Sequence, residues 1–246
     1  MNFTFTQDQL DFQEAISSML RTEVTADSIR ARWHNESGVD SAFMQQAHDL
    51  GLNSMLIPES LGGLGLTPVD FILLAEACGE VALPEPLVES VMVTTPSLVD
   101  ILDQGLGNAD VQKVIDGVLA GEFRVALGHA INPCINYADT ADWFLLPDGD
   151  GVYLLPKEAV TLEAKTSVDP SRRLFSASFA ASDACLVADG DAGANLQRAM
   201  LNRGALASAA QLVGLSRGML QQSVGYTSDR EQFGRCLLYT SPSPRD

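Results

Sequence analysis

Arg230 carries a side chain that could hold an anionic ligand. It stands near the end of a long helical pattern, and Gln232 and Phe233 follow it closely in the sequence. A guanidinium donates paired, charge-assisted hydrogen bonds to phosphate groups. A cation is also favoured at the C-terminal end of a helix by the helix dipole. Arg230 is therefore either a pyrophosphate ligand or an ordinary charge at a helix end.

Two other sites offer polar chemistry. Arg172 and Arg173 form a cationic pair before a predicted strand. They either face solvent at the strand entry or meet the phosphates of a ligand. His129 follows a strand pattern and is either a polar ligand contact or a structural histidine.

Metal chemistry is not expected. The four cysteines and three histidines have no CxxC or Cys/His spacing, which metal sites require. Free thiols in apolar surroundings behave as small hydrophobes. We therefore predict no metal and reduced, buried cysteines.

Composition narrows the class of protein. The chain has 246 residues, 46% of them hydrophobic and 19% charged, with a net charge of −17. The apolar share excludes a mostly disordered chain, and no apolar stretch is long enough to predict a membrane span. The excess of acid would repel nucleic acid. With no secretory pattern at the start, we expect a cytoplasmic protein.

Residues 1–121 are predicted to form an all-helical N-terminal domain. Thr6 can cap a first helix, Gly51 can end a helix over residues 41–50, and Thr67 with Pro68 can begin another. Between them lies a glycine-rich loop, residues 58–66. It has no Lys or Arg nearby, so we interpret it as architectural.

Residues 122–189 are predicted to form a β-domain. Short runs rich in β-formers alternate with turn residues, such as those at 147–151. Strands without intervening helices favour an antiparallel sheet, barrel-like or sandwich-like, over a parallel one. No GxGxxG pattern opens a helix, which argues against a dinucleotide-binding Rossmann domain.

Residues 190–235 are predicted to begin a C-terminal helical domain with one long helix. About 36 helical residues would span roughly 54 Å. Small residues from Gly204 to Gly214 favour close packing against helices that we do not find elsewhere in the chain. Residues 236–246 follow neither a helix nor a strand pattern, so we predict a non-native tail after a truncated third domain. The fold class is α+β and multidomain.

Three motifs occur in one order along residues 1–235. A P-E-x-x-G-G-x-G-like loop at Pro58 precedes a helix with an E-x-x-G pattern at Glu76. Residues 169–174 follow, and then a Y-x-x-x-R-x-Q-F-G signature occupies residues 226–234. Together they resemble the acyl-CoA dehydrogenase family, with this chain as a divergent member that breaks off in the C-terminal helical domain.

The resemblance implies an FAD-dependent oxidoreductase, a flavoprotein of fatty acid and lipid metabolism. Its reaction would be the α,β-dehydrogenation of an acyl-CoA thioester, in which a carboxylate removes a proton and the flavin takes a hydride. Arg230 and Gln232 would contact the phosphate end of FAD, with Phe233 packed beside them. In the family this contact commonly crosses a subunit interface, which implies a homo- or hetero-oligomer (dimer or tetramer). An electron-transfer flavoprotein or a similar acceptor would take the electrons.

The chain also departs from the family pattern. The T-E-P-x-x-G-S-D stretch is missing from residues 126–133. In most members the catalytic glutamate lies beyond the point at which this chain leaves the pattern, and nothing assigns that role to Glu231. We therefore name no catalytic residue. The alternatives are a non-catalytic subunit of a hetero-oligomeric acyl-CoA dehydrogenase, or an inactive fragment.

Overall fold

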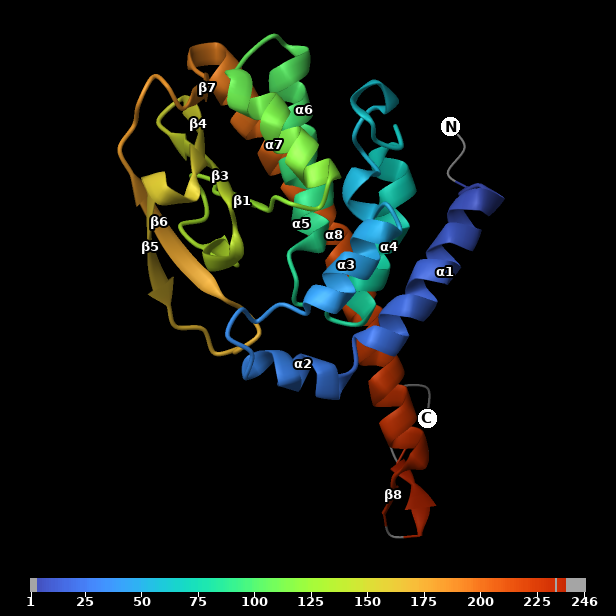
Figure 1. Ribbon diagram of the computed structural model, residues 1–246. Coiled ribbons are helices and arrows are strands. Elements are labelled where there is room, and N and C mark those ends of the chain that lie inside the picture. The colour runs from blue at the N-terminus through green and yellow to red at the C-terminus, as the bar shows by residue number, and fades with distance from the viewer. Residues whose placement is uncertain (1–3, 233, 238–246) are drawn as a thin grey trace.

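A computed structural model describes residues 4–232 and 234–237. Helices form the N-terminal part, two β-sheets follow in the middle, and a single long helix, α8 (Gly190–Asp229), runs behind the helices (Figure 1). The predicted α+β architecture is confirmed. Among the described residues the strands do not close into a barrel.

The N-terminal part consists of seven α-helices and three short helical turns. The α-helices are α1 (Gln7–Glu23), α2 (Ala26–Trp33), α3 (Ser41–Asp49), α4 (Pro68–Glu80), α5 (Leu87–Glu89), α6 (Thr95–Asp103) and α7 (Ala109–Leu119). The turns are η1 (Leu52–Ser54), η2 (Glu59–Leu61) and η3 (Ser90–Thr94), of which η3 has π-helical geometry and joins α5 to α6.

The predicted helix starts follow from their capping residues. The Thr6 hydroxyl accepts the Gln9 N–H at 3.3 Å, and the Gln9 side chain accepts the Thr6 N–H at 2.9 Å. At α4, the Thr67 hydroxyl and N–H both donate to the Asp70 carboxylate, which also accepts from Gln9. The Thr67 hydroxyl bond is the main cause that lowers the pKa of Asp70. One hydrogen-bonded cluster therefore begins α4 and ties it to α1.

The middle part contains two sheets. One has the order β1-β3-β4-β7 and the other β2-β6-β5. The strands are β1 (Val125–Leu127), β2 (Ile135–Asn136), β3 (Trp143–Asp148), β4 (Gly151–Pro156), β5 (Val160–Lys165), β6 (Leu174–Phe179) and β7 (Leu186–Ala188).

The expectation of a purely antiparallel β-domain is wrong for one pair, because β1 runs parallel to β3, with Val125 opposite Trp143. A parallel pair needs a long connection. Residues 128–142 supply it by crossing to the second sheet, where they form β2. The two residues of β2 are too few to leave an alternating pattern in the sequence, so this strand was not predicted.

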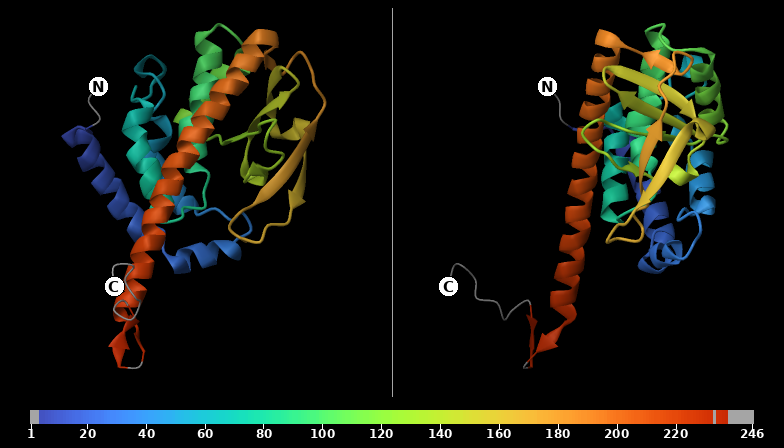
Figure 2. Two further views of the ribbon diagram at one scale, coloured as in Figure 1. Left: turned by 180° about the vertical axis from the view of Figure 1, so that it is seen from behind. Right: turned by 90° about the vertical axis from the view of Figure 1, so that its left-hand side faces the viewer.

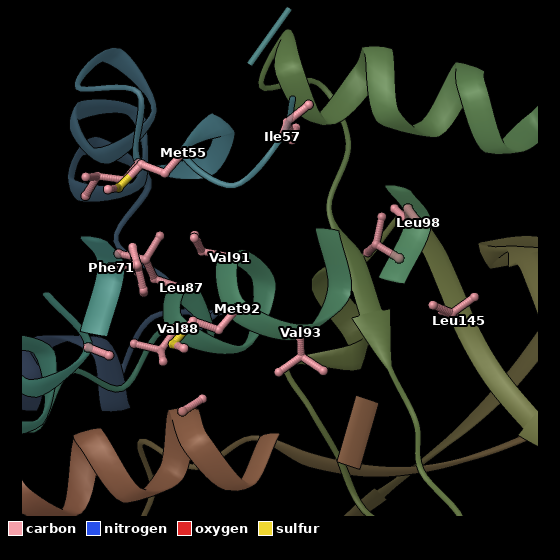
Figure 3. Close-up of a cluster of buried hydrophobic side chains, with 14 of the residues drawn as sticks. Met55, Ile57, Phe71, Leu87, Val88, Val91, Met92, Val93, Leu98 and Leu145 are labelled. Atoms are coloured by element: carbon pink, nitrogen blue, oxygen red, sulfur yellow. The ribbon is translucent and has the colours of Figure 1, made fainter. Parts of the chain in front are cut away.

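The largest hydrophobic cluster joins the helices to the first sheet. Figure 3 shows its centre, where Val91, Met92 and Val93 of η3 and Leu98 of α6 lie between Phe71 of α4 and Leu145 of β3. These side chains are almost fully buried. Because one core is shared, the helical part and the first sheet hold each other in place.

Helix α8 (Gly190–Asp229) has 40 residues and packs along α4. A Cβ at Gly214 would lie 1.8 Å from the Glu76 carbonyl oxygen, and one at Gly79 would lie 2.0 Å from that of Gln211. The small residues of α8 therefore serve, at least in part, a helix of this same chain, and the expectation that all of their partners lie elsewhere is wrong. Figure 2 shows α8 running past the body to a hairpin of β8 (Glu231–Gln232) and β9 (Arg235–Cys236).

The predicted tail lies largely outside the described residues. Cys236 pairs with Glu231 in the β8–β9 hairpin, contrary to the expectation of no regular structure from residue 236 onward. The proposed domain boundaries stay predictions. Cys78 is buried as expected, whereas Cys134, Cys185 and Cys236 are only partly buried. None of the helices in the described ranges has the length and apolar character needed to cross a bilayer.

Candidate functional site: a cavity between the helices and the second sheet

A cavity of about 630 Å³ lies where five parts of the chain meet. Its helical side comes from the end of α4, the segment leading into α5, and the middle of α8. Its other side comes from β2 and the β5–β6 loop. Apolar lining residues cluster on the helical side (Leu83, Val88, Val93, Ala207, Leu212, Leu215), and polar ones on the β side (Asn132, Asn136, Asp169, Ser171, Arg172).

Glu89 brings a carboxyl group into the helical side of this cavity. The Asn136 side-chain amide donates to its Oε2 at 3.3 Å, across the gap between α5 and β2. Burial raises the pKa of Glu89 to about 7, against the opposing effects of the Asn136 hydrogen bond and the Arg172 charge. An acid whose pKa is moved to near neutrality in a cavity is a candidate functional group.

The β side of the cavity is held by Tyr137. Its hydroxyl donates to the Ser171 carbonyl at 2.6 Å, and its N–H donates to the Arg173 carbonyl at 2.8 Å. Burial is the main cause that raises the pKa of Tyr137 to about 12, so the phenol stays a donor at neutral pH. These two hydrogen bonds from Tyr137 therefore fix the position of the β5–β6 loop.

Both described non-glycine residues with positive φ lie at this cavity. Ala82 (φ 53°) lines it, and Tyr137 (φ 52°) follows the lining residue Asn136. Such backbone strain costs of order 1–3 kcal/mol per residue and concentrates at functional sites. Its occurrence at one lining residue and directly after another supports a functional role for this cavity.

A buried ion pair supports the helical wall. The Arg32 Nε donates to Glu85 Oε1 at 2.5 Å, and the Asp40 N–H donates to the same oxygen at 3.2 Å. Arg32 is 4% exposed and Glu85 is 3% exposed. Glu85 also lines the cavity, so this pair anchors α2 to the segment that carries Glu89.

The two adjacent arginines have different roles. Arg173 pairs with Asp139, donating to it from both Nε and Nη2. Arg172 is exposed and lines the cavity. Of the two alternatives for this pair, ligand contact is open to Arg172 alone. The sequence could not separate them, because the difference depends on Asp139, 34 positions from Arg173.

The predicted FAD ligands lie away from the cavity. Arg230 ends α8, and Gln232 lies in β8; both are exposed. Leu215 is the last α8 residue in the cavity, and the 15 residues from it to Arg230 span about 22 Å of helix. Phe233 lies outside the described residues. The assignment of these three residues stays a prediction.

His129 has structural contacts. Its Nε2 lies 3.0 Å from the Gln197 carbonyl oxygen of α8, and its Nδ1 accepts the Ile131 N–H at 3.3 Å. The ring therefore ties the loop after β1 to α8, which fits the structural alternative. No group of three or more His, Cys, Asp or Glu side chains within the described ranges could hold a metal ion.

Sequence reasoning missed Glu89, Glu85 and Asn136. The two acids, Glu85 and Glu89, interrupt a run over residues 81–93 that is otherwise largely apolar. Acidic side chains are rarely buried unless they are paired. Acids within this apolar run are therefore the sequence signal that indicates buried, paired carboxylates.

The architecture is similar to that of several solved structures. The fold matches that of the ChsE4–ChsE5 complex from Mycobacterium tuberculosis, with a TM-score of 0.79, 20% identity, and coverage of 98% of this chain and 72% of that one. It also matches the FAD complex of PigA, with a TM-score of 0.75, 16% identity, and coverage of 96% and 72%. The fold is that of the acyl-CoA dehydrogenases.

The sequence comparisons agree with the fold. Residues 6–116 match the family model "Acyl-CoA dehydrogenase, N-terminal domain". The chain is 25% identical over 225 residues to acyl-CoA dehydrogenase IpdE2 of Mycolicibacterium smegmatis and 28% identical over 261 residues to acyl-CoA dehydrogenase FadE27 of Mycobacterium tuberculosis. The sequence and the fold are both similar to those of the acyl-CoA dehydrogenase family. The matches cover 91% and 96% of this chain, but only 65% and 69% of those relatives.

Proposed function

We propose that the chain is an FAD-dependent oxidoreductase of the acyl-CoA dehydrogenase type, acting on an acyl-CoA thioester by α,β-dehydrogenation. The cavity is the observation that carries this proposal. Its apolar helical side suits an acyl chain, and the exposed Arg172 supplies a cation for the phosphates of coenzyme A. FAD, when bound, would accept the hydride, and an electron-transfer flavoprotein or similar acceptor would take the electrons onward.

The residues at the end of α8 fit the phosphate end of FAD by their chemistry. Arg230 offers a guanidinium and Gln232 an amide, both exposed, and within the described ranges no carboxylate forms an ion pair with Arg230. They lie about 22 Å of helix beyond the cavity. We therefore propose that Arg230 and Gln232 of one subunit complete the flavin site of another, with Phe233 packed beside them.

Arg172→Ala should weaken binding of octanoyl-CoA by about 5- to 10-fold, since an exposed charge-assisted contact to phosphate is lost. Isothermal titration calorimetry would measure the dissociation constant at low and high salt. The difference between the two proteins should shrink as salt rises, because exposed charges are screened. Arg198→Ala is the matched control, since the side chain of this α8 arginine, among the described residues, hydrogen-bonds only to Asn195 of the same helix. Equal weakening by both changes would contradict the assignment of Arg172.

Arg230→Ala should raise the dissociation constant for FAD by at least about 10-fold, since a guanidinium–phosphate contact is worth roughly 1.5–3 kcal/mol. Quenching of flavin fluorescence during titration of the purified protein would report binding. Arg21→Ala, on α1, is a control that changes net charge equally. Unchanged FAD binding in Arg230→Ala, with wild type binding FAD well, would overturn the carried-over role.

A second candidate function is a non-catalytic subunit of a hetero-oligomeric acyl-CoA dehydrogenase. The separation of Arg230 from the cavity favours it, because one chain then holds parts of two sites. The similarity to a protein solved as a complex of two different chains adds support. Co-expression with a second acyl-CoA dehydrogenase chain from the same genome tests it. Flavin and activity would appear only in the co-purified complex; flavin and activity in the chain alone would exclude this candidate.

A further inference from the structure

The cavity contains a pair of polar side chains that could form further hydrogen bonds, and a plain hydrocarbon chain would leave that capacity unused. Glu89 and Asn136 bond to each other through Oε2 and the side-chain amide, and the described part of the structure records no other hydrogen bond to the Glu89 carboxyl group. A ligand that fills the cavity removes water from both groups. A buried polar group without a partner costs about 1–3 kcal/mol. A saturated acyl chain would bear that cost, whereas a chain with an oxygen opposite Glu89 would not.

Apolar side chains line the same cavity as Glu89, which suits a hydrocarbon chain that carries one oxygen. Its neighbour Val88 and Val93 of η3 are buried on the same helical side, and Leu215 of α8 lines the same cavity. One polar point within an apolar wall is the pattern by which ligand sites fix the orientation of a largely apolar molecule. The pattern therefore indicates a ligand that is mostly hydrocarbon with a single oxygen function.

We propose that Glu89, positioned by Asn136, donates a hydrogen bond to a keto or hydroxyl oxygen carried on the acyl chain, so that the site selects oxygen-bearing acyl-CoA thioesters over saturated fatty acyl-CoA. This inference rests on the proposed function, and it names the substrate class of that same site. Glu89 is a specificity-determining residue and takes no part in the transfer of the proton or the hydride.

The acid is poised for this role. With a pKa of about 7, Glu89 keeps its proton below neutrality and can donate it to an oxygen acceptor. Above neutrality it becomes a carboxylate that can no longer donate, and a ketone offers it no proton in return. Affinity for a keto-acyl ligand should therefore fall by about 10-fold between pH 6 and pH 8.

Other charged groups around the cavity are few. Glu85 precedes α5 and is paired with Arg32, Asp169 accepts from the Ser171 N–H and hydroxyl, and Arg172 is a permanent cation. Cys78 of α4 has a pKa raised by burial to about 12. The residues of α8 that line the cavity are uncharged, and no histidine lines it within the described ranges. A change near pH 7 that disappears in Glu89→Gln is therefore assigned to Glu89.

The test compares octanoyl-CoA with 5-, 6- and 7-oxooctanoyl-CoA by calorimetry on the purified full chain. We expect at least one oxo ligand to bind about 10-fold more tightly than octanoyl-CoA at pH 6. Glu89→Leu should abolish that preference while leaving octanoyl-CoA bound as well as, or better than, before. Glu89→Gln, whose amide still donates, should keep the preference and lose its pH dependence. Thermal unfolding of each variant would verify folding.

The outcomes separate this inference from the proposed function. Failure of every acyl-CoA ligand to bind the wild-type chain would overturn the proposed function, and this inference with it. Binding of all ligands with equal affinity would overturn only the selection of an oxygen-bearing chain. Equal weakening of oxo and plain ligands by Glu89→Leu would also overturn it, since Glu89 would then contact a part that all of them share.

Discussion

Glu85→Leu should lower the free energy of unfolding by about 3–5 kcal/mol, because the change leaves the buried Arg32 guanidinium charged and without its buried partner. The Arg32 side chain is 3% exposed and that of Glu85 is 0% exposed, so water cannot replace the lost partner. Asp40 lies within 3.5 Å of Arg32 but is itself partly exposed, and it compensates only in part. Urea denaturation followed by circular dichroism would measure the loss.

Two further variants test whether the loss of stability comes from the burial of the unpaired charge. Arg30→Ala removes the exposed pair between Arg30 and Asp27, and should cost under about 1 kcal/mol. The double change Arg32→Met with Glu85→Leu removes both buried charges, and should recover most of the stability lost in the single variant. A double variant as unstable as the single one would show that packing, not the unpaired charge, is responsible.

Gly214→Ala should destabilise the protein by about 3 kcal/mol, even though alanine favours a helix by about 1 kcal/mol over glycine. The added Cβ would lie 1.8 Å from the Glu76 carbonyl oxygen and 2.8 Å from the Glu80 nitrogen. Both neighbours are backbone atoms of α4 and its end, so no side chain can rotate away. The helices must move apart, which loosens one wall of the cavity. A lower midpoint of thermal unfolding would record the effect.

Gly225→Ala is the matched control on the same helix. Among the described residues, and apart from its own stretch of helix, no atom lies within 4 Å of the Cβ that it would add. It should raise the free energy of unfolding by about 0.5–1 kcal/mol through helix propensity alone. A neutral or stabilising effect of Gly214→Ala, like that of Gly225→Ala, would contradict the close backbone contact between α8 and α4.

Local signals predicted much of the fold. Capping by Thr6 and Thr67 located two helix starts, and six of the described strands match runs of β-forming residues. The parallel pairing of β1 with β3 was missed because register between distant segments leaves no local pattern. The contact between Gly214 and α4 was missed for the same reason, since a small residue in a helix does not identify its partner.

The candidate site was less predictable than the fold. Arg172 was recognised as a possible ligand contact, but the cavity joins it to Glu89, which lies 83 positions earlier. The Arg32–Glu85 pair spans 53 positions. Such pairs follow from tertiary packing, which desolvates the charges and places their partners. Motif resemblance supplied Arg230 and Gln232, and it did so without reference to this cavity.

Helix α8 also has a mechanical consequence. Its middle forms a wall of the cavity, where close backbone contacts at Gly214 and Gly218 hold it to the end of α4, while its last turns extend beyond the body (Figure 2). A tilt of α8 about this contact would therefore move its far end. A tilt of about 5° would displace Arg230, about 22 Å further along, by roughly 2 Å. That is enough to break a hydrogen bond, so filling of the cavity would be linked, through one rigid helix, to the phosphate contact that we propose for Arg230.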